Sequence, residues 1–304
     1  MQLLCPSAVQ RGDSPSGARV QTTFCVDAGA PVFAGHYPHH PLLPGVFLVE
    51  AAVQALEPGL GRYGVDWTVL AVRQLRLHGA VAPGMAVRLE ALAVMKEDGA
   101  ASWQCTFSHE ERCLARCMLE LGPMPAAGGA GASASAIAAP GASTRLDPAA
   151  IVRRLAHRAP MLLVDGAELG SGGMTLRAHK TISLNEPAFS TLDANGHCGQ
   201  FAYPACLVME SFIQACALLV TEQRPLRGTD VMLLCGVREF DMSGQARAGQ
   251  QLHHEVRLQR FMADTALLDG RSYTAEGEVG HFREVLVAVR PVVPARAVSG
   301  TGPM

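Results

Sequence analysis

The sequence predicts an α+β protein made of two similar halves, each an antiparallel sheet wrapped around one buried central helix. The chain has 304 residues, enough for two domains of ordinary size, and 49% of them are hydrophobic, so each half can bury a core. A low-complexity stretch lies near the middle, and short motifs that precede it recur in the same order after it. The two halves are therefore expected to pack together as a pseudo-dimer.

The low-complexity stretch covers residues 123–144 and reads PMPAAGGAGASASAIAAPGAST. A segment so rich in Ala, Gly, Ser and Pro has too few large apolar side chains to order itself, which is typical of a flexible linker. This boundary divides the chain into a first domain at 1–122 and a second domain at 145–294. Residues 295–304 are expected to form a disordered tail.

Four matched features relate the two halves. Residues 50–54 (EAAVQ) match 210–214 (ESFIQ), and residues 72–75 (VRQL) match 237–240 (VREF). A proline six residues before each Glu and a glycine 11 residues after each Arg complete the set: Pro44, Pro204, Gly84 and Gly249. Because the four matches keep the same order, the sequence indicates an internal duplication.

In the first half, alternation of apolar and polar side chains predicts a strand at 20–26. A helix is predicted at 46–56, and it should be buried because it is apolar on nearly all faces. Further strands are expected at 87–95, 103–108 and 113–121, with a turn at Glu97-Asp98-Gly99.

The second half repeats this order, with a strand at 174–184 and a buried helix at 207–220. The later strands are predicted at 252–261, 272–279 and 284–289. A leading helix is added before them: Asp147 is a good N-cap, Pro148 suits the first helical position, and Ile151 and Leu155 share a face.

Composition excludes several classes of protein. The formal net charge of −2 argues against broad nucleic-acid binding, which needs a basic face. Nine scattered cysteines without a CxxC pair indicate reduced thiols and a cytoplasmic protein. The first residues show no signal peptide, and the longest uncharged apolar run, near 215–220, is too short to cross a membrane.

One motif carries the chemistry. Residues 35–50 read GHYPHHPLLPGVFLVE, and Glu50 follows His36 by 14 positions. The stretch resembles the signature G-H-F-P-x-x-P-x-x-P-G-V of the beta-hydroxyacyl-acyl-carrier-protein dehydratases of fatty-acid synthesis, in which an acidic residue follows the His at this spacing. The resemblance implies that each half has the hotdog fold of that family.

The second half resembles another part of the same family. Residues 151–165 look like its opening I-x-x-L-L-P-H-R-x-P-x-L-L-V-D, with His157 and Arg158 at the H-R positions. Residues 180–189 look like its K-x-V-T-x-N-E-P-x-F segment. The resemblance thus extends over most of both halves.

The resemblance implies dehydration of a (3R)-3-hydroxyacyl thioester on an acyl carrier protein to the trans-2-enoyl thioester, in fatty-acid or polyketide biosynthesis. This reaction needs a base for the α proton and an acid for the leaving hydroxyl. His36, whose side chain titrates near neutrality, suits the first role, and a carboxyl on the buried helix suits the second. The N–H of Gly45, at the start of the first helix, is the candidate donor to the developing enolate oxygen. No metal or organic cofactor is required.

In the family, the His of one hotdog works with the acidic residue of its partner. Here that implies two composite sites, His36 with Glu210 and Glu50 with His197. The second is damaged: His197 precedes Glu210 by 13 residues, the prolines of 196–205 are mostly gone, and the glycine is replaced by Ala205. We expect the His36–Glu210 site to be the working one and the other to be weak or inactive.

Several alternatives remain at this stage. Hotdog thioesterases also use a carboxylate on the central helix but generally lack the His-Pro loop, and some relatives isomerise the enoyl product. A non-catalytic subunit that binds acyl carrier protein would explain the damaged motif. A metal site at His36, His39 and His40 is disfavoured because the run lacks a fourth ligand. Beyond the carrier protein, the expected partner is a second double hotdog or another dehydratase subunit.

Overall fold

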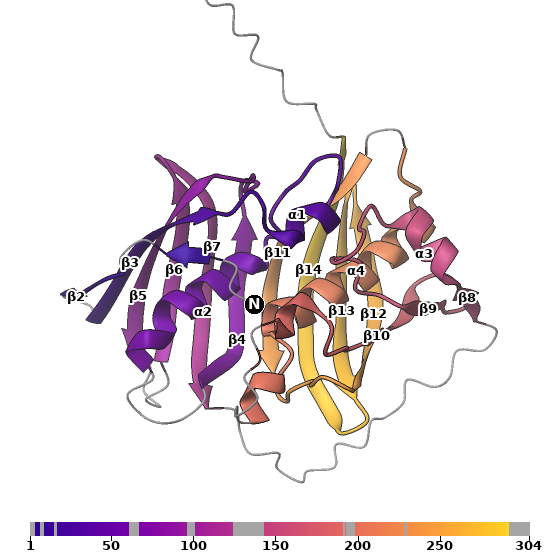
Figure 1. Ribbon diagram of the computed structural model, residues 1–304. Helices are drawn as coiled ribbons and strands as arrows, with labels where there is room; N and C mark the ends of the chain where they lie inside the picture. Colours follow the sequence, from indigo (N-terminus) through magenta and orange to yellow (C-terminus); the bar gives the residue numbers. More distant parts are fainter. Residues whose placement is uncertain are drawn as a thin grey trace, which may run out of the picture.

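The computed structural model of the chain describes residues 4–6, 9–14, 17–60, 67–95, 101–123, 143–190, 192, 198–227 and 230–291. Within these residues, the strands form one continuous antiparallel sheet of 14 strands. Figure 1 shows the two halves side by side, with one central helix in each. Nearly all of the predicted linker 123–144 and all of the tail 295–304 lie outside the described residues.

The first half contains seven strands and two helices in the described part of the chain. In order they are β1 (Leu4–Pro6), β2 (Gln10–Ser14), β3 (Gly17–Val26), α1 (Pro31–Gly35), α2 (Phe47–Leu60), β4 (Trp67–Leu77), β5 (Ala86–Met95), β6 (Ala101–His109) and β7 (Arg112–Pro123). The order in the sheet is β1-β3-β5-β6-β7-β4, and β2 pairs with β3.

The second half follows the same plan. Its described elements are β8 (Thr144–Leu146), α3 (Pro148–Arg154), β9 (Gly166–Leu169), β10 (Thr175–Thr181), the 3-10 turns η2 (Pro187–Phe189) and η3 (Cys198–Phe201), α4 (Ala205–Gln223), β11 (Asp230–Met242), β12 (Gln251–Met262), β13 (Thr265–Thr274) and β14 (Gly277–Pro291). The sheet continues as β11-β14-β13-β12-β10-β9-β8, so β4 and β11 meet at the junction.

The pairing of β4 with β11 at the junction has the symmetry of the internal repeat. In the antiparallel register Val72 lies opposite Phe240 and Leu75 lies opposite Val237. The sequence match equates Val72 with Val237 and Leu75 with Phe240, so each pairing is the image of the other across a pseudo-twofold axis. Arg73 reaches across this axis to form an ion pair with Asp241. The duplicated motif thus builds the interface between the halves.

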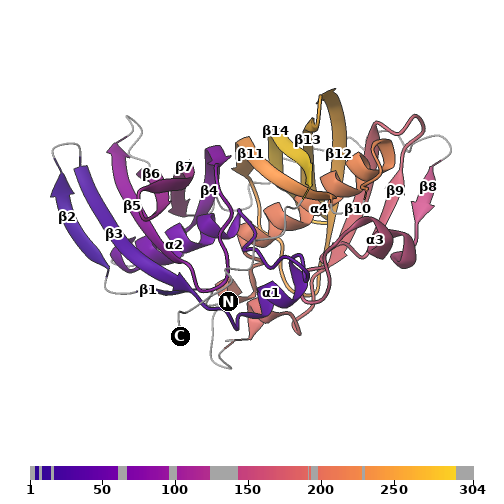
Figure 2. The same cartoon turned by 90° about the horizontal axis from the view of Figure 1, so that it is seen from above.

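The two central helices lie against one face of the sheet, which curves around them (Figure 2). All side chains of α4 from Ala205 to Thr221 are buried, including Glu210 and Gln214. By length and composition this helix could cross a membrane, but 89% of its 18-residue apolar stretch is buried inside the protein. It is therefore the core helix of its half. It extends a few residues beyond both ends of the helix predicted at 207–220.

The leading helix of the second half is confirmed in detail. α3 begins with Pro148 after Asp147, whose side chain accepts a hydrogen bond from the N–H of Ala150 at 2.6 Å. Ile151 and Leu155 are both buried and pack into the core. The cap thus orients the chain that leads into the H-R segment of the second half.

Other boundaries differ from the prediction. The strand predicted at 272–279 spans the hairpin turn between β13 and β14, because Thr274 pairs with Gly277 and only two residues form the turn. The strand predicted at 174–184 ends at Thr181, since residues 182–184 turn away to begin the loop before η2. Strands β4 and β11 and the short helix α1 were not predicted as elements.

Candidate active site

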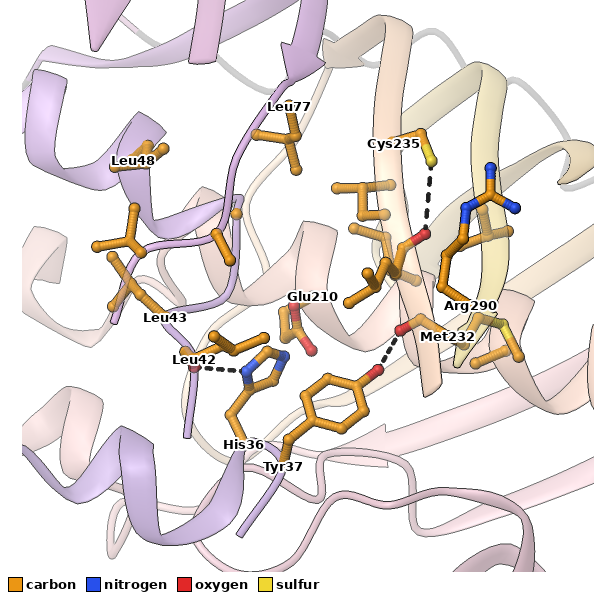
Figure 3. A pocket seen from close by; sticks show the side chains of 18 of the residues that line it. His36, Tyr37, Leu42, Leu43, Leu48, Leu77, Glu210, Met232, Cys235 and Arg290 are labelled. Carbon is orange, nitrogen blue, oxygen red and sulfur yellow. Dashed lines mark hydrogen bonds between the residues drawn. The ribbon is translucent and has the colours of Figure 1, made fainter. Parts of the chain in front are cut away.

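A cavity of about 420 Å³ lies at the junction of the two halves. Its walls come from the end of α1, the loop into α2, the end of β4, the middle of α4, and strands β11 and β14. Figure 3 shows His36 and Tyr37 below Glu210, with Arg290 and Cys235 to the right. Most of the lining side chains are apolar, so the few polar groups stand out as candidates for chemistry.

The first glycine of the motif brings the two halves together at this cavity. Gly35 is buried, and its carbonyl oxygen accepts a hydrogen bond from the N–H of Arg158 at 2.8 Å. A Cβ added at Gly35 would overlap the carbonyl oxygen of Arg158 and lie 2.6 Å from the backbone nitrogen of Met161. The motif therefore needs glycine here so that the loop at 157–161 can dock against the end of α1.

His36 follows α1 directly, and its backbone N–H caps the helix by donating to Val32 O at 2.8 Å. Its ring is buried, and Nδ1 lies 2.7 Å from the carbonyl oxygen of Leu42. A carbonyl can only accept, so this contact places the ring proton on Nδ1 and leaves Nε2 with a free lone pair. Burial lowers the pKa of His36 to about 4, although the nearby Glu210 opposes the shift.

Glu210 projects from α4 toward the same point and is only 4% exposed. Its Oε1 accepts a hydrogen bond from Gln214 Nε2 at 3.0 Å, and His157 Nε2 lies 3.4 Å from the same oxygen. Burial acts to raise the pKa of Glu210, but the hydrogen bond from His157, the charge of His36 and the contact with Gln214 outweigh it and lower the pKa. Gln214 is itself fixed by Leu163 N–H at 2.9 Å.

The structure thus brings together His36 and Glu210, the pair expected to form one composite site. One ligand atom from each of His36, His157 and Glu210 lies within 4.8 Å of the others, and all three residues are buried. His157 was noted in the sequence only as part of the H-R motif and was not predicted at the site. The same three donors match the ligand preferences of a divalent metal ion.

Gly45 occupies the turn that opens α2, where Leu48 N–H donates to its carbonyl oxygen at 3.2 Å. It lines the cavity, and a Cβ at this position would overlap Cδ1 of Leu77. Glycine therefore keeps the backbone at the start of α2 open to the cavity. The N–H groups of a helix start attract negative charge, and the role of Gly45 as a donor to the enolate oxygen stays a prediction.

Tyr37 is a residue that the sequence reasoning missed. It stands where the family signature has Phe, and its backbone has a positive φ of 54°. The hydroxyl donates a hydrogen bond to the carbonyl oxygen of Met232 on β11 (Figure 3). Its ring centroid lies 4.6 Å from that of His36 and 5.1 Å from that of His157. Tyr37 thus ties the His-bearing loop of the first half to the sheet of the second.

Glu50 lies elsewhere in the described structure. It projects from α2, is half-buried, accepts a hydrogen bond from Gln54 at 2.9 Å, and is not among the described residues that line the cavity. The buried thiol of Cys206 on α4 lies beside it, and burial together with the Glu50 carboxylate raises the pKa of that thiol. Its expected partner His197 lies outside the described residues.

Comparisons with known proteins agree with this architecture. Residues 12–116 match the ApeI-like family (ApeI dehydratase), and residues 155–279 match the FabA-like domain. The chain is 31% identical over 129 residues to the 3-hydroxyacyl-[acyl-carrier-protein] dehydratase FabZ of Alkalilimnicola ehrlichii, covering 41% of this chain and 80% of that protein. It is 30% identical over 145 residues to FabZ of Halorhodospira halophila, covering 47% and 91%.

Solved structures resemble the whole chain in fold. The dehydratase domain of the polyketide PpsC from Mycobacterium tuberculosis aligns with a TM-score of 0.63 at 15% identity, covering 93% of this chain and 97% of that domain. The dehydratase domain of RzxB from Pseudomonas fluorescens gives 0.62 at 14% identity, with the same coverage. The fold and the cavity define a tandem hotdog protein of dehydratase type. The chain belongs to the FabZ family of 3-hydroxyacyl-[acyl-carrier-protein] dehydratases.

Proposed function

We propose that this protein dehydrates a (3R)-3-hydroxyacyl thioester carried on acyl carrier protein and releases the trans-2-enoyl thioester, in fatty-acid or polyketide biosynthesis. The observation that carries the proposal is the convergence of His36 from one half and Glu210 from the other in one mostly apolar cavity. A base and an acid at adjacent points are what elimination of water requires. The dehydratase relatives support the same reaction class.

His36 is the proposed base. Its Nδ1–H is engaged by Leu42 O at 2.7 Å, so Nε2 is available to take the α proton of the substrate. The lowered pKa keeps the ring neutral at physiological pH, which is the form a base must have. After proton transfer the imidazolium lies next to Glu210, whose negative charge stabilises it.

Glu210 is the proposed acid. Its contacts lower its pKa, so the form that acts is the protonated fraction: this gives its proton to the β hydroxyl, which leaves as water, while the electron pair of the broken α C–H bond forms the double bond. The leftover carboxylate and the protonated His36 then form an ion pair, and transfer of the proton from Nε2 to the carboxylate restores the starting state. Glu210 and His36 therefore exchange one proton per turnover, and no cofactor is consumed.

The remaining walls suit the acyl thioester. We propose that the thioester oxygen faces the N–H groups at the start of α2 near Gly45, where the developing negative charge of the enolate is stabilised. Apolar side chains continue the cavity beyond the reacting atoms, where the acyl chain would lie: Leu48, Leu77, Ile213, Ala217, Leu234 and Val287.

We propose a single working site in each chain. The motif at 196–205 that would supply its histidine is damaged, and Glu50 lies beside a buried thiol rather than in the described cavity. We also propose a cytoplasmic location, supported by free thiols at seven of the nine cysteines.

A carrier-bound 3-hydroxybutyryl thioester, analysed by mass spectrometry after incubation with the protein, tests the function. Loss of one water from the acyl group supports dehydration, whereas release of free carrier thiol would favour the thioesterase alternative. An unchanged acyl group across several chain lengths would favour a non-catalytic subunit. A shifted double bond, detected by fragmentation, would add isomerisation.

A further inference from the structure

His157 occupies a central place in the site although neither role in the proposed reaction is assigned to it. It follows α3 in the second half and is only 6% exposed. Its ring centroid lies 5.1 Å from that of His36 and 5.1 Å from that of Tyr37, and its Nε2 lies 3.4 Å from Glu210 Oε1. These residues are the titratable groups that face His157, from the end of α1 and from α4.

The surroundings of the His157 ring determine which of its nitrogens donates a hydrogen bond. Within the described part of the chain, His157 Nδ1 is buried and has no hydrogen-bond partner. A buried imidazolium would leave a charged N–H donor there, which costs far more than an unused lone pair on a neutral ring. Nε2 faces Glu210 Oε1, the oxygen that also accepts from Gln214 Nε2, so this oxygen acts as an acceptor. This geometry places a ring proton on Nε2, directed at Glu210 Oε1.

Two donors therefore converge on one oxygen of Glu210. Gln214 Nε2 lies 3.0 Å and His157 Nε2 lies 3.4 Å from Oε1. A carboxylate has two oxygens, and with Oε1 engaged twice the catalytic proton belongs on Oε2. The orientation of the carboxyl group is thereby restricted to the one that presents Oε2 to a substrate.

We propose that His157 is a positioning residue for the dehydration: by donating from Nε2 to Glu210 Oε1 it orients the carboxyl group and strengthens it as an acid. The inference rests on the proposed function, since it assigns a role within that reaction. Hydrogen bonds that stabilise the ionised carboxylate make its proton easier to give to the leaving hydroxyl. The docking of Arg158 on Gly35 holds His157 in place, so the acid is oriented only when the two halves are packed together.

The test compares His157→Ala with His157→Gln, whose amide nitrogen can reach the position of Nε2. Loss of the donor in His157→Ala should raise the pKa of Glu210 by about one unit, the equivalent of one hydrogen bond to a charged group. The shift can be measured in the protein without substrate by ¹³C NMR of labelled glutamate carboxyls, with Glu210→Gln to assign the signal. His157→Gln should shift it much less. His253→Gln, on the far side of β12, is the control.

The same variants are then tested for turnover across pH. Because Glu210 must be protonated to act as the acid, a raised pKa should move the upper pH limit of kcat/KM upward in His157→Ala while the maximal rate falls roughly tenfold or more. His157→Gln should recover most of the rate. A purely structural role would lower the melting temperature of both variants and leave the carboxyl pKa and the pH limit unchanged, which would overturn the inference. If His157→Ala raised the pKa of Glu210 as expected but the wild-type protein showed no turnover, the result would contradict the proposed function alone.

Discussion

The carbonyl oxygen of Leu42 lies 2.7 Å from Nδ1 of His36, and this contact determines which ring nitrogen of the histidine can act as a base. The loop between them contains the prolines of the motif, which restrict the backbone and so fix the carbonyl relative to the ring. The Nε2 lone pair is therefore directed into the cavity before any substrate arrives.

Replacing His36 tests this arrangement. We expect His36→Ala to reduce kcat by ~10²–10⁴-fold, the usual contribution of a general base, while the protein stays folded. The rate of water loss from a 3-hydroxyacyl-carrier protein, followed by mass spectrometry, measures the effect. His39→Ala, three residues along in the same loop and exposed, should retain wild-type turnover. Equal activity of both variants would exclude His36 as the base.

The two carboxylates of the repeat should behave differently. Glu210→Gln removes the acid of the described cavity, and we expect ~10²-fold or greater loss of kcat. Glu50→Gln preserves the size of a side chain that contacts Gln54 and Cys206, and it should leave the rate within about twofold. A comparable loss in both variants would mean that both composite sites contribute to turnover.

Stability should depend on pH through the buried histidines. The pKa of His36 is lowered to about 4 and that of His254 to about 3, from ordinary values of 6.5. Below pH 6.5 the unfolded chain binds protons at these positions that the folded chain does not, so the free energy of unfolding should fall as the pH drops from 6.5 toward 4. Each shift corresponds to a loss on the order of a few kcal/mol.

Urea unfolding at a series of pH values measures this dependence. His36→Gln should flatten the curve between pH 6.5 and 4, because the variant no longer carries one of the two groups. His39→Gln, which removes an exposed histidine, should leave the curve unchanged. A wild-type protein whose stability is constant over this range would show that the two buried rings accept protons without cost.

The docking of the two halves at Gly35 makes a structural prediction. Gly35→Ala would force a Cβ against the backbone of Arg158 and Met161, which cannot move as freely as the end of a side chain. We expect destabilisation by about 1–3 kcal/mol and reduced turnover, because His157 and Glu210 would be displaced relative to His36. Gly29→Ala, where the nearest atom is an exposed Asp27 oxygen at 3.5 Å, is the matched control. Thermal melts of both variants decide the point.

Removal of metal ions should have no effect on turnover. The trio His36, His157 and Glu210 has the donor types for a divalent ion, but the proposed reaction uses them as base, positioning group and acid. Prolonged dialysis against a chelator should leave kcat unchanged, and added Zn²⁺ should inhibit by competing for the same lone pairs. Loss of activity on chelation, restored by one metal, would contradict the proposed roles.

Much of the fold could be predicted because the duplication leaves independent marks. The matched prolines and the match of 72–75 with 237–240 indicated two equivalent halves, and the structure pairs those segments across the junction. Strands β4 and β11 were missed as elements because each has bulges that interrupt the alternation of apolar and polar side chains. The turn between β13 and β14 has only two residues, which is too short a break in the sequence pattern to separate the two strands.

The site was predicted in part. The spacing of the motif singled out His36, and the repeat singled out Glu210, because each belongs to a pattern readable along the chain. His157 and Tyr37 depend on contacts between segments far apart in sequence: the loop at 157–161 meets Gly35, and Tyr37 meets Met232 across the junction. No local pattern encodes such contacts, although His157 belongs to the H-R motif and Tyr37 stands where the family signature has Phe.

The most direct test of the central claim compares the dehydration rates of three single variants with that of the wild type. In a single chain, His36→Ala and Glu210→Gln should each abolish loss of water from a 3-hydroxyacyl-carrier protein, while a chain with Glu50→Gln should dehydrate it at close to the wild-type rate. This result would establish one composite site made from both halves. If His36→Ala or Glu210→Gln dehydrated the substrate as fast as the wild type, the account of a His36–Glu210 site would be wrong.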